Sequence, residues 1–144
     1  MLRHFSRKSL ALLMLLLSFF LFVTQAKTLL LDDSDDSSHL CVYVGDTVTI
    51  KLASNPSTGY SWGQPEGIAH LQLLSAQPEQ GPADRVGAPG FQIFSFKATE
   101  AGESTLSLNY IRPFEKNTPA VKTFLVTLTI EPRPFIANNP AAKP

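Results

Sequence analysis

From residue 42 onward, apolar and polar residues alternate in short runs, the pattern of β-strands that bury one face. Each of the following groups falls on one face of its strand: Val48, Ile50 and Leu52; Phe94, Phe96 and Ala98; Leu106, Leu108 and Tyr110; Phe124, Val126, Leu128 and Ile130. Turn-forming residues separate the runs, and no segment keeps a helical period. The pattern predicts an all-β fold, an immunoglobulin-like antiparallel β-sandwich of about seven to eight strands over residues 40–131, with Trp62 buried between the sheets.

The two ends of the chain depart from this pattern. Residues 1–26 begin with basic residues, continue with an apolar run of about 15 residues, shorter than a membrane span, and end in small residues at Thr24 and Ala26. They predict a cleaved export signal peptide, and thus a periplasmic or secreted protein; an uncleaved membrane anchor is the alternative. Residues 27–39 are rich in aspartate and predict an acidic flexible lead-in, whereas residues 132–144 contain four prolines and predict a disordered tail.

Composition narrows the classes of function. The 144 residues suffice for one domain, and their 12 basic and 12 acidic side chains leave no basic stripe for a nucleic acid. Residues 1–26 hold three of the basic residues and none of the acidic ones, so the remainder carries nine against 12. The single cysteine cannot form an intrachain disulfide. We expect an acidic monomer that binds no nucleic acid.

The sequence offers few candidates for catalytic or metal-ligating residues. Residues 59–63 match the Gly-x-Ser-x-Gly pattern of serine hydrolases, but that motif needs a following helix and a later acid and histidine, and no histidine follows Asp84. A small hydrolase that uses Ser61 is therefore a remote alternative. His39, His70 and Cys41 lack the spacing of metal ligands, and Cys41 is expected to be a small buried residue on a strand. We predict no catalytic residue, metal site or cofactor.

Three loops carry the more specific signals. The first loop, residues 55–60, has Pro56 to stiffen one end and Gly59 to permit a positive φ at the other. The second ends in residues 87–90 and opens into a strand, and the third begins at residues 112–114. In a seven-stranded sandwich the first and third loops lie at the same end, and the long span 77–90 can flank them if it reaches that end. Each loop alone could be an ordinary turn, but together they predict a binding edge.

This combination resembles the chagasin family of cysteine-protease inhibitors, immunoglobulin-like sandwiches that carry Asn-Pro-Thr-Thr-Gly plus an aromatic, Gly-x-Gly-Gly, and Arg-Pro-Trp or Arg-Pro-Phe. The resemblance extends from residue 42 to about residue 130. The first motif is matched except that Ser57 replaces a threonine, the second except that Pro89 replaces a glycine, and the third outright. The matching segments are Asn55, Pro56, Ser57, Thr58, Gly59 and Tyr60; Gly87, Ala88, Pro89, Gly90 and Phe91; and Arg112, Pro113 and Phe114.

The resemblance implies a reversible, non-covalent inhibitor of papain-like cysteine peptidases, which is not an enzyme. On that model the three loops lie across the active-site cleft, with Ser57 and Thr58 at its centre. Residues 87–91 would pair with the enzyme as an extended strand, while Arg112 and Phe114 would supply an arginine and an aromatic anchor. The competing hypothesis is an exported immunoglobulin-like adhesive or structural module without a protease target.

Overall fold

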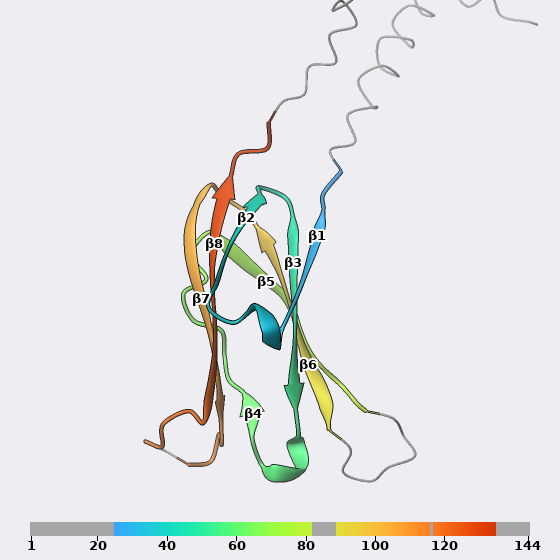
Figure 1. The fold of residues 1–144 in the computed structure, drawn as a ribbon, viewed down its shortest axis with the longest axis vertical. Coiled ribbons are helices and arrows are strands. Elements are labelled where there is room, and N and C mark those ends of the chain that lie inside the picture. Colours follow the sequence, from blue (N-terminus) through green and yellow to red (C-terminus); the bar gives the residue numbers. More distant parts are fainter. Residues whose placement is uncertain (1–24, 82–88, 116, 135–144) are drawn as a thin grey trace, which may run out of the picture.

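The computed structural model describes residues 25–81, 89–115 and 117–134. In this part of the chain, eight strands form two four-stranded sheets that pack face to face (Figure 1). The order in one sheet is β1-β3-β6-β5, and in the other β2-β8-β7-β4. The strands are β1 (Thr28–Asp32), β2 (Ser38–Tyr43), β3 (Thr47–Ser54), β4 (Ser61–Trp62), β5 (Leu71–Glu79), β6 (Gly90–Ala98), β7 (Gly102–Ile111) and β8 (Lys122–Glu131).

The core lies between the two sheets and consists of the alternating residues that the sequence pattern selected. Apart from Tyr110, which is partly buried, the side chains of those four runs are almost fully buried. Trp62 is only 3% exposed, so the prediction of a buried tryptophan between the sheets is confirmed. An immunoglobulin-like sandwich is therefore the fold. In the described residues, no helix is long and apolar enough to cross a bilayer.

Two pairings at the sheet edges are parallel, where the sequence predicted antiparallel ones. β1 runs parallel to β3, and β2 runs parallel to β8. The reason is that the chain passes from one sheet to the other between β1 and β2, through the short 3₁₀ turn η2 (Asp33–Asp35). The remaining four pairings are antiparallel.

The prediction of a flexible lead-in over residues 27–39 is wrong for the described chain. Thr28–Asp32 forms β1 and contributes the buried side chain of Leu31 to the core. Asp32 caps η2 by accepting a hydrogen bond from the Ser34 amide at 2.8 Å, and the Asp35 carboxylate accepts one from the Asp32 amide at 2.9 Å. Because these aspartates satisfy backbone donors at a turn, their acidity indicates capping rather than disorder.

The expectation that Cys41 is buried is also wrong. Its neighbour Val42 points into the core, and successive strand side chains face opposite ways, so Cys41 is exposed on β2. Local desolvation and the carboxylate of Glu131 both raise the pKa of Cys41 above its usual value. The thiol is therefore less reactive than an unperturbed cysteine.

The strand directions bring the three loops to one end of the sandwich. β3 ends where the first loop begins, β7 ends where the third begins, and the paired ends of β5 and β6 are joined by the second (Figure 1). We call this the loop end; residues 25–27 and 132–134 lie at the opposite end. The predicted signal peptide falls on residues 1–26 and the predicted tail on 132–144, and most of both lies outside the described residues.

Candidate functional site

The first loop is held in shape by its own hydrogen bonds. Its 3₁₀ turn, η3 (Pro56–Thr58), is capped by Asn55, whose side-chain oxygen accepts from the Ser57 amide at 3.3 Å and from the Ser57 hydroxyl at 2.5 Å. The Thr58 hydroxyl donates to the Asn55 carbonyl at 2.6 Å. Gly59 ends the turn with φ of 78°, a conformation that disfavours side chains with a Cβ. The tip is therefore ordered before any partner binds.

Tyr110, near the end of β7, supports this loop from below. Its hydroxyl accepts a hydrogen bond from the Asn55 amide at 2.9 Å. Its ring stacks on Tyr60, with centroids 5.5 Å apart, and packs against Trp62 at 5.0 Å. Aromatic pairs at such separations contribute about 0.5–1.5 kcal/mol each beyond the area they bury. The loop therefore rests on a column of aromatic rings, in which its own Tyr60 and Trp62 of β4 flank Tyr110 of β7, and both strands belong to the other sheet.

The third loop turns back at residues 112–115. The Glu115 amide donates to the Arg112 carbonyl at 3.0 Å, and the two side chains form an ion pair at 2.8 Å. The guanidinium carbon of Arg112 lies 4.4 Å from the ring centroid of Tyr60. The hydrogen bond that the guanidinium donates to Glu115 raises the pKa of Arg112 above its usual value, so the guanidinium stays charged. Arg112 therefore joins the third loop to the first through a cation–π contact.

The first and third loops also touch directly. A Cβ placed on Gly59 would lie 3.2 Å from Cζ of Phe114, so the phenylalanine ring packs against the glycine. Even so, 70% of Phe114 is exposed, and Pro113 beside it is exposed as well. A large aromatic side chain held in place yet open to solvent is a typical anchor for a protein partner.

The second loop leaves and re-enters the sheet beside the first. Gly90 pairs with Ser54, and a Cβ on it would lie 2.4 Å from the Glu79 carbonyl, so only glycine fits there. Phe91 is 39% exposed, with the Lys51 ammonium 4.3 Å from its ring centroid. Pro89 is exposed at the end of the loop. Gly87 and Ala88 lie outside the described residues.

The structure therefore brings together the predicted residues of the first and third loops and places Gly90 and Phe91 at the same end of the molecule. The sequence pattern did not indicate Tyr110 as a support, Glu115 as the partner of Arg112, or Lys51 as the cation over Phe91. Tyr110 could have been found, because its hydroxyl comes from an inward-facing strand position and therefore needs a hydrogen-bond partner. The other two depend on side-chain contacts that no local pattern encodes.

The structure also places the residues that were set aside in the sequence. Ser61 lies on β4, a two-residue strand preceded by η3, rather than at a strand-to-helix turn. His70 lies at the opposite end of the sandwich, against Gly102 and 3.5 Å from the Glu100 carboxylate. Within residues 25–81, 89–115 and 117–134, no group of three or more potential ligands could hold a metal ion.

Similarity to known proteins extends over the strands and loops described above. Residues 41–128 match the model of the chagasin family peptidase inhibitors I42. Amoebiasin-2 from Entamoeba histolytica is 29% identical over 109 residues, which cover 74% of this chain and 89% of the relative. Chagasin from Trypanosoma cruzi is 32% identical over 80 residues, 52% of this chain and 73% of the relative.

Among solved structures, a cysteine protease inhibitor from Entamoeba histolytica superposes with a TM-score of 0.66 and 25% sequence identity. That alignment covers 74% of this chain and 98% of the solved chain. The family model spans all three loops and most of both sheets, so the match concerns the whole sandwich rather than one motif. This chain belongs to the chagasin family of peptidase inhibitors.

Proposed function

We propose that this protein is a reversible, non-covalent inhibitor of papain-like cysteine peptidases that closes the active-site cleft with the three loops of its loop end. The contact between Gly59 and the exposed ring of Phe114 carries the proposal most directly, because it makes one continuous edge from two loops. Membership of an inhibitor family and similarity to a cysteine protease inhibitor support it. The protein acts by binding and is not an enzyme.

The geometry of the first loop explains why such an inhibitor would not be cut. The side chain of Asn55 and the αL backbone of Gly59 hold the tip as a 3₁₀ turn, whereas a peptidase cleaves an extended backbone. Ser57 and Thr58, both exposed on this turn, would occupy the centre of the cleft without presenting a peptide bond in a productive shape. Since the tip is already ordered, little conformational entropy is lost on docking.

The other two loops would give affinity on either side of the first. Phe114 and Arg112 combine the aromatic and guanidinium groups that dominate many protein interfaces. Residues 87–91 would lie along the cleft as an extended segment and pair through the backbone. An edge of three loops is consistent with the roughly 1,600 Å² that a standard protease–inhibitor interface buries.

The inhibitor would act as an exported monomer, in the periplasm or outside the cell. The basic start and apolar run of residues 1–26 support export, and strand pairing begins directly after the proposed cleavage point, at Thr28.

The test is the hydrolysis of a fluorogenic peptide by papain in the presence of residues 27–144. We expect slowing at nanomolar to micromolar protein, reversed on dilution, and its loss in an Arg112→Ala/Phe114→Ala double variant that remains folded. Leu30→Ala is the matched control, because Leu30 is 73% exposed, similar to Phe114, but lies on β1. Unchanged inhibition in the double variant would contradict closure of the cleft by the three loops, and no slowing by the wild type would favour the adhesive module.

A further inference from the structure

Two strands extend beyond their edge partners toward the loop end. The pairing of β1 with β3 stops at Asp32 and Lys51, although β3 continues to Ser54. The pairing of β2 with β8 starts at Ser38 and Val126, although β8 begins at Lys122. The facing backbone groups of both strands therefore lack a strand partner and need another.

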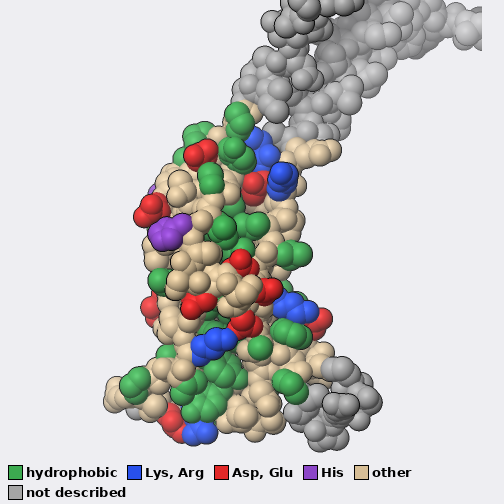
Figure 2. All heavy atoms as spheres, viewed as in Figure 1, with side chains coloured by type: hydrophobic (Ala, Val, Ile, Leu, Met, Phe, Trp, Pro, Cys, Tyr) green, Lys and Arg blue, Asp and Glu red, His purple; other side chains and the backbone are tan. Residues whose placement is uncertain are grey.

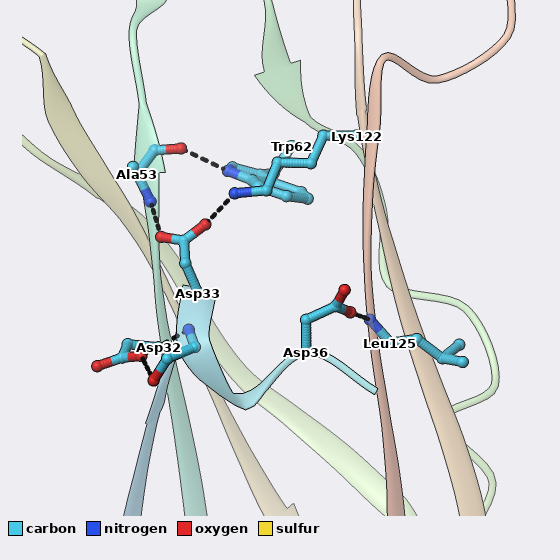
Figure 3. A network of polar contacts seen from close by, with 8 residues as sticks. Asp32, Asp33, Asp36, Ala53, Trp62, Lys122 and Leu125 are labelled. Atoms are coloured by element: carbon cyan, nitrogen blue, oxygen red, sulfur yellow. Dashed lines mark hydrogen bonds and ion pairs between the residues drawn. The ribbon is translucent and has the colours of Figure 1, made fainter. Parts of the chain in front are cut away.

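Residues 33–37, the acidic segment through which the chain crosses from β1 to β2, supply those partners (Figure 3). One carboxylate oxygen of Asp33 accepts a hydrogen bond from the Ala53 amide at 3.0 Å. A carboxylate oxygen of Asp36 accepts one from the Leu125 amide at 2.8 Å, and the Ser37 amide donates to the Leu125 carbonyl at 2.7 Å. Figure 2 shows acidic side chains gathered over η2, in the middle of this face. Residues 33–37 thus replace a strand at the edge of each sheet.

Asp33 also connects the two sheets to each other. Its second carboxylate oxygen pairs with the ammonium of Lys122, the first residue of β8. That ammonium lies 5.7 Å from the ring centroid of Trp62, whose indole N–H donates to the Ala53 carbonyl at 3.0 Å. Ala53, Asp33, Lys122 and Trp62 therefore form one connected group that spans the gap between β3 and β8 (Figure 3).

This group lies at the base of the binding edge. Ala53 is two residues before Asn55, which opens the first loop, and Lys122 directly follows the last residue of the third loop. We propose that Asp33 is a positioning residue, which fixes the separation of the first and third loops by tying the strands that carry them. We call the link that Asp33 makes to Ala53 and Lys122 the tie. The inference rests on the proposed function, because it assigns the tie a purpose in inhibition.

The tie is placed where it affects loop position more than global stability. The side chains of Asp33 and Lys122 are 33% and 49% exposed, and ion pairs of such exposure contribute little to the free energy of unfolding. A change in the separation of two loops that must enter one cleft together, in contrast, lowers affinity because both must be reordered on docking.

The first experiment compares three variants of the full chain as inhibitors of papain, at a temperature where all are folded. Asp33→Ala is expected to raise the inhibition constant about tenfold, the loss that follows when loop order must be restored on binding. Asp35→Ala removes the same charge from the same turn but leaves the tie intact, so its inhibition constant should change by about twofold at most. Asp33→Asn keeps an acceptor for Ala53 without the ion pair and should lie between them.

A second measurement does not depend on inhibition. Spin labels at Ser57→Cys and Thr118→Cys, in a Cys41→Ser background, report the distance between the first and third loops. Asp33→Ala should broaden the distance distribution, and Asp35→Ala should leave it as in the wild type. An unchanged distribution in Asp33→Ala overturns the positioning role whatever papain does, and so does a loss of inhibition equal to that of Asp35→Ala. Failure of the wild type to inhibit papain would instead refute the proposed function, and the distance measurement would still decide the role of Asp33.

Discussion

The two ends of the sandwich use their polar and aromatic side chains in opposite ways. At the end opposite the loops, Asp46 is 4% exposed and accepts hydrogen bonds from the amides of Lys27 and Tyr43, at 2.9 and 3.0 Å. It also forms an ion pair with Arg133. At the loop end, Arg112 is tied to Glu115 and Tyr60, but Phe114 beside it remains 70% exposed.

This difference between the two ends indicates that one end stabilises the fold and the other presents a binding surface. The bonds of Asp46 join the segments before β1 and after β8 to the β2–β3 turn. The carboxylate itself is buried and not accessible to a partner. The loop end uses its bonds to order a surface and leaves that surface open. Changes at the opposite end should therefore lower the free energy of unfolding, and changes at the loop end should weaken inhibition.

The largest effect is expected from Asp46→Ala. The substitution leaves two backbone amides without their acceptor and removes the anion that pairs with Arg133, and losing a buried carboxylate with these partners costs about 3 kcal/mol. Chemical denaturation should show this loss, whereas the inhibition constant for papain, measured on folded protein, should stay within about twofold of the wild type. Glu103→Ala, an exposed acid on β7, is the control. Weakened inhibition by folded Asp46→Ala would break the proposed division between the ends.

Acidification offers a milder form of the same test. Burial alone would raise the pKa of Asp46, but the amides of Lys27 and Tyr43 and the Arg133 guanidinium lower it below its usual value. A lowered folded-state pKa means that the stabilisation is complete above the pKa of an unfolded aspartate, about 4, and is lost as the pH falls through the folded-state pKa. Denaturation of wild type and Asp46→Asn between pH 7 and pH 2 should therefore converge at the acid end. Parallel curves would contradict this role of the carboxylate.

Gly59→Ala and Gly45→Ala form a matched pair across the two ends. Both glycines have positive φ, 78° and 93°, so each alanine should cost about 1 kcal/mol of stability. A Cβ on Gly59 would press on Phe114 at 3.2 Å, while one on Gly45 would have nothing within 4 Å. Inhibition should therefore weaken, by about tenfold, only in Gly59→Ala, because the anchor ring is displaced. Equal inhibition constants for the two variants would show that Phe114 is not part of the binding edge.

Tyr110→Phe tests the aromatic column under the first loop. The variant keeps the ring stack with Tyr60 and Trp62 but leaves the Asn55 amide without its acceptor, at a cost of about 1 kcal/mol. Amide hydrogen exchange should become faster at Asn55, and the inhibition constant should rise about fivefold if this order matters for docking. Tyr43→Phe, at the opposite end, is the control. Unaltered exchange at Asn55 would show that the loop is ordered without Tyr110.

The sandwich could be predicted because the alternation of apolar and polar residues depends only on neighbours along the chain, whatever the order of the strands in the sheets. The shared end of the first and third loops followed from the strand order, and the loop motifs identified the residues. The errors have a different origin. Asp33 and Asp36 resembled solvated residues because their partners Ala53, Lys122 and Leu125 lie 20 to 89 positions away. The support from Tyr110 likewise depends on Asn55, 55 positions away. Contacts between side chains and distant backbone groups cannot be inferred from composition.

The smallest effect is expected from Ser57→Thr, which restores the residue usual in the family motif. In the free inhibitor Ser57 is exposed, and its hydroxyl donates to Asn55, a bond that threonine can also make. The added methyl should therefore leave the midpoint of thermal unfolding unchanged. If residue 57 enters the centre of the cleft, burial of that methyl should strengthen inhibition by about 0.8 kcal/mol, or roughly fourfold. Titration of both proteins against the same papain sample can resolve such a factor. The reverse change at Thr118, Thr118→Ser, removes a methyl from the third loop and serves as the comparison. An inhibition constant that Ser57→Thr leaves unaltered would place the tip of the first loop outside the buried part of the interface, and the loop end would then bind through Phe114 and its neighbours alone.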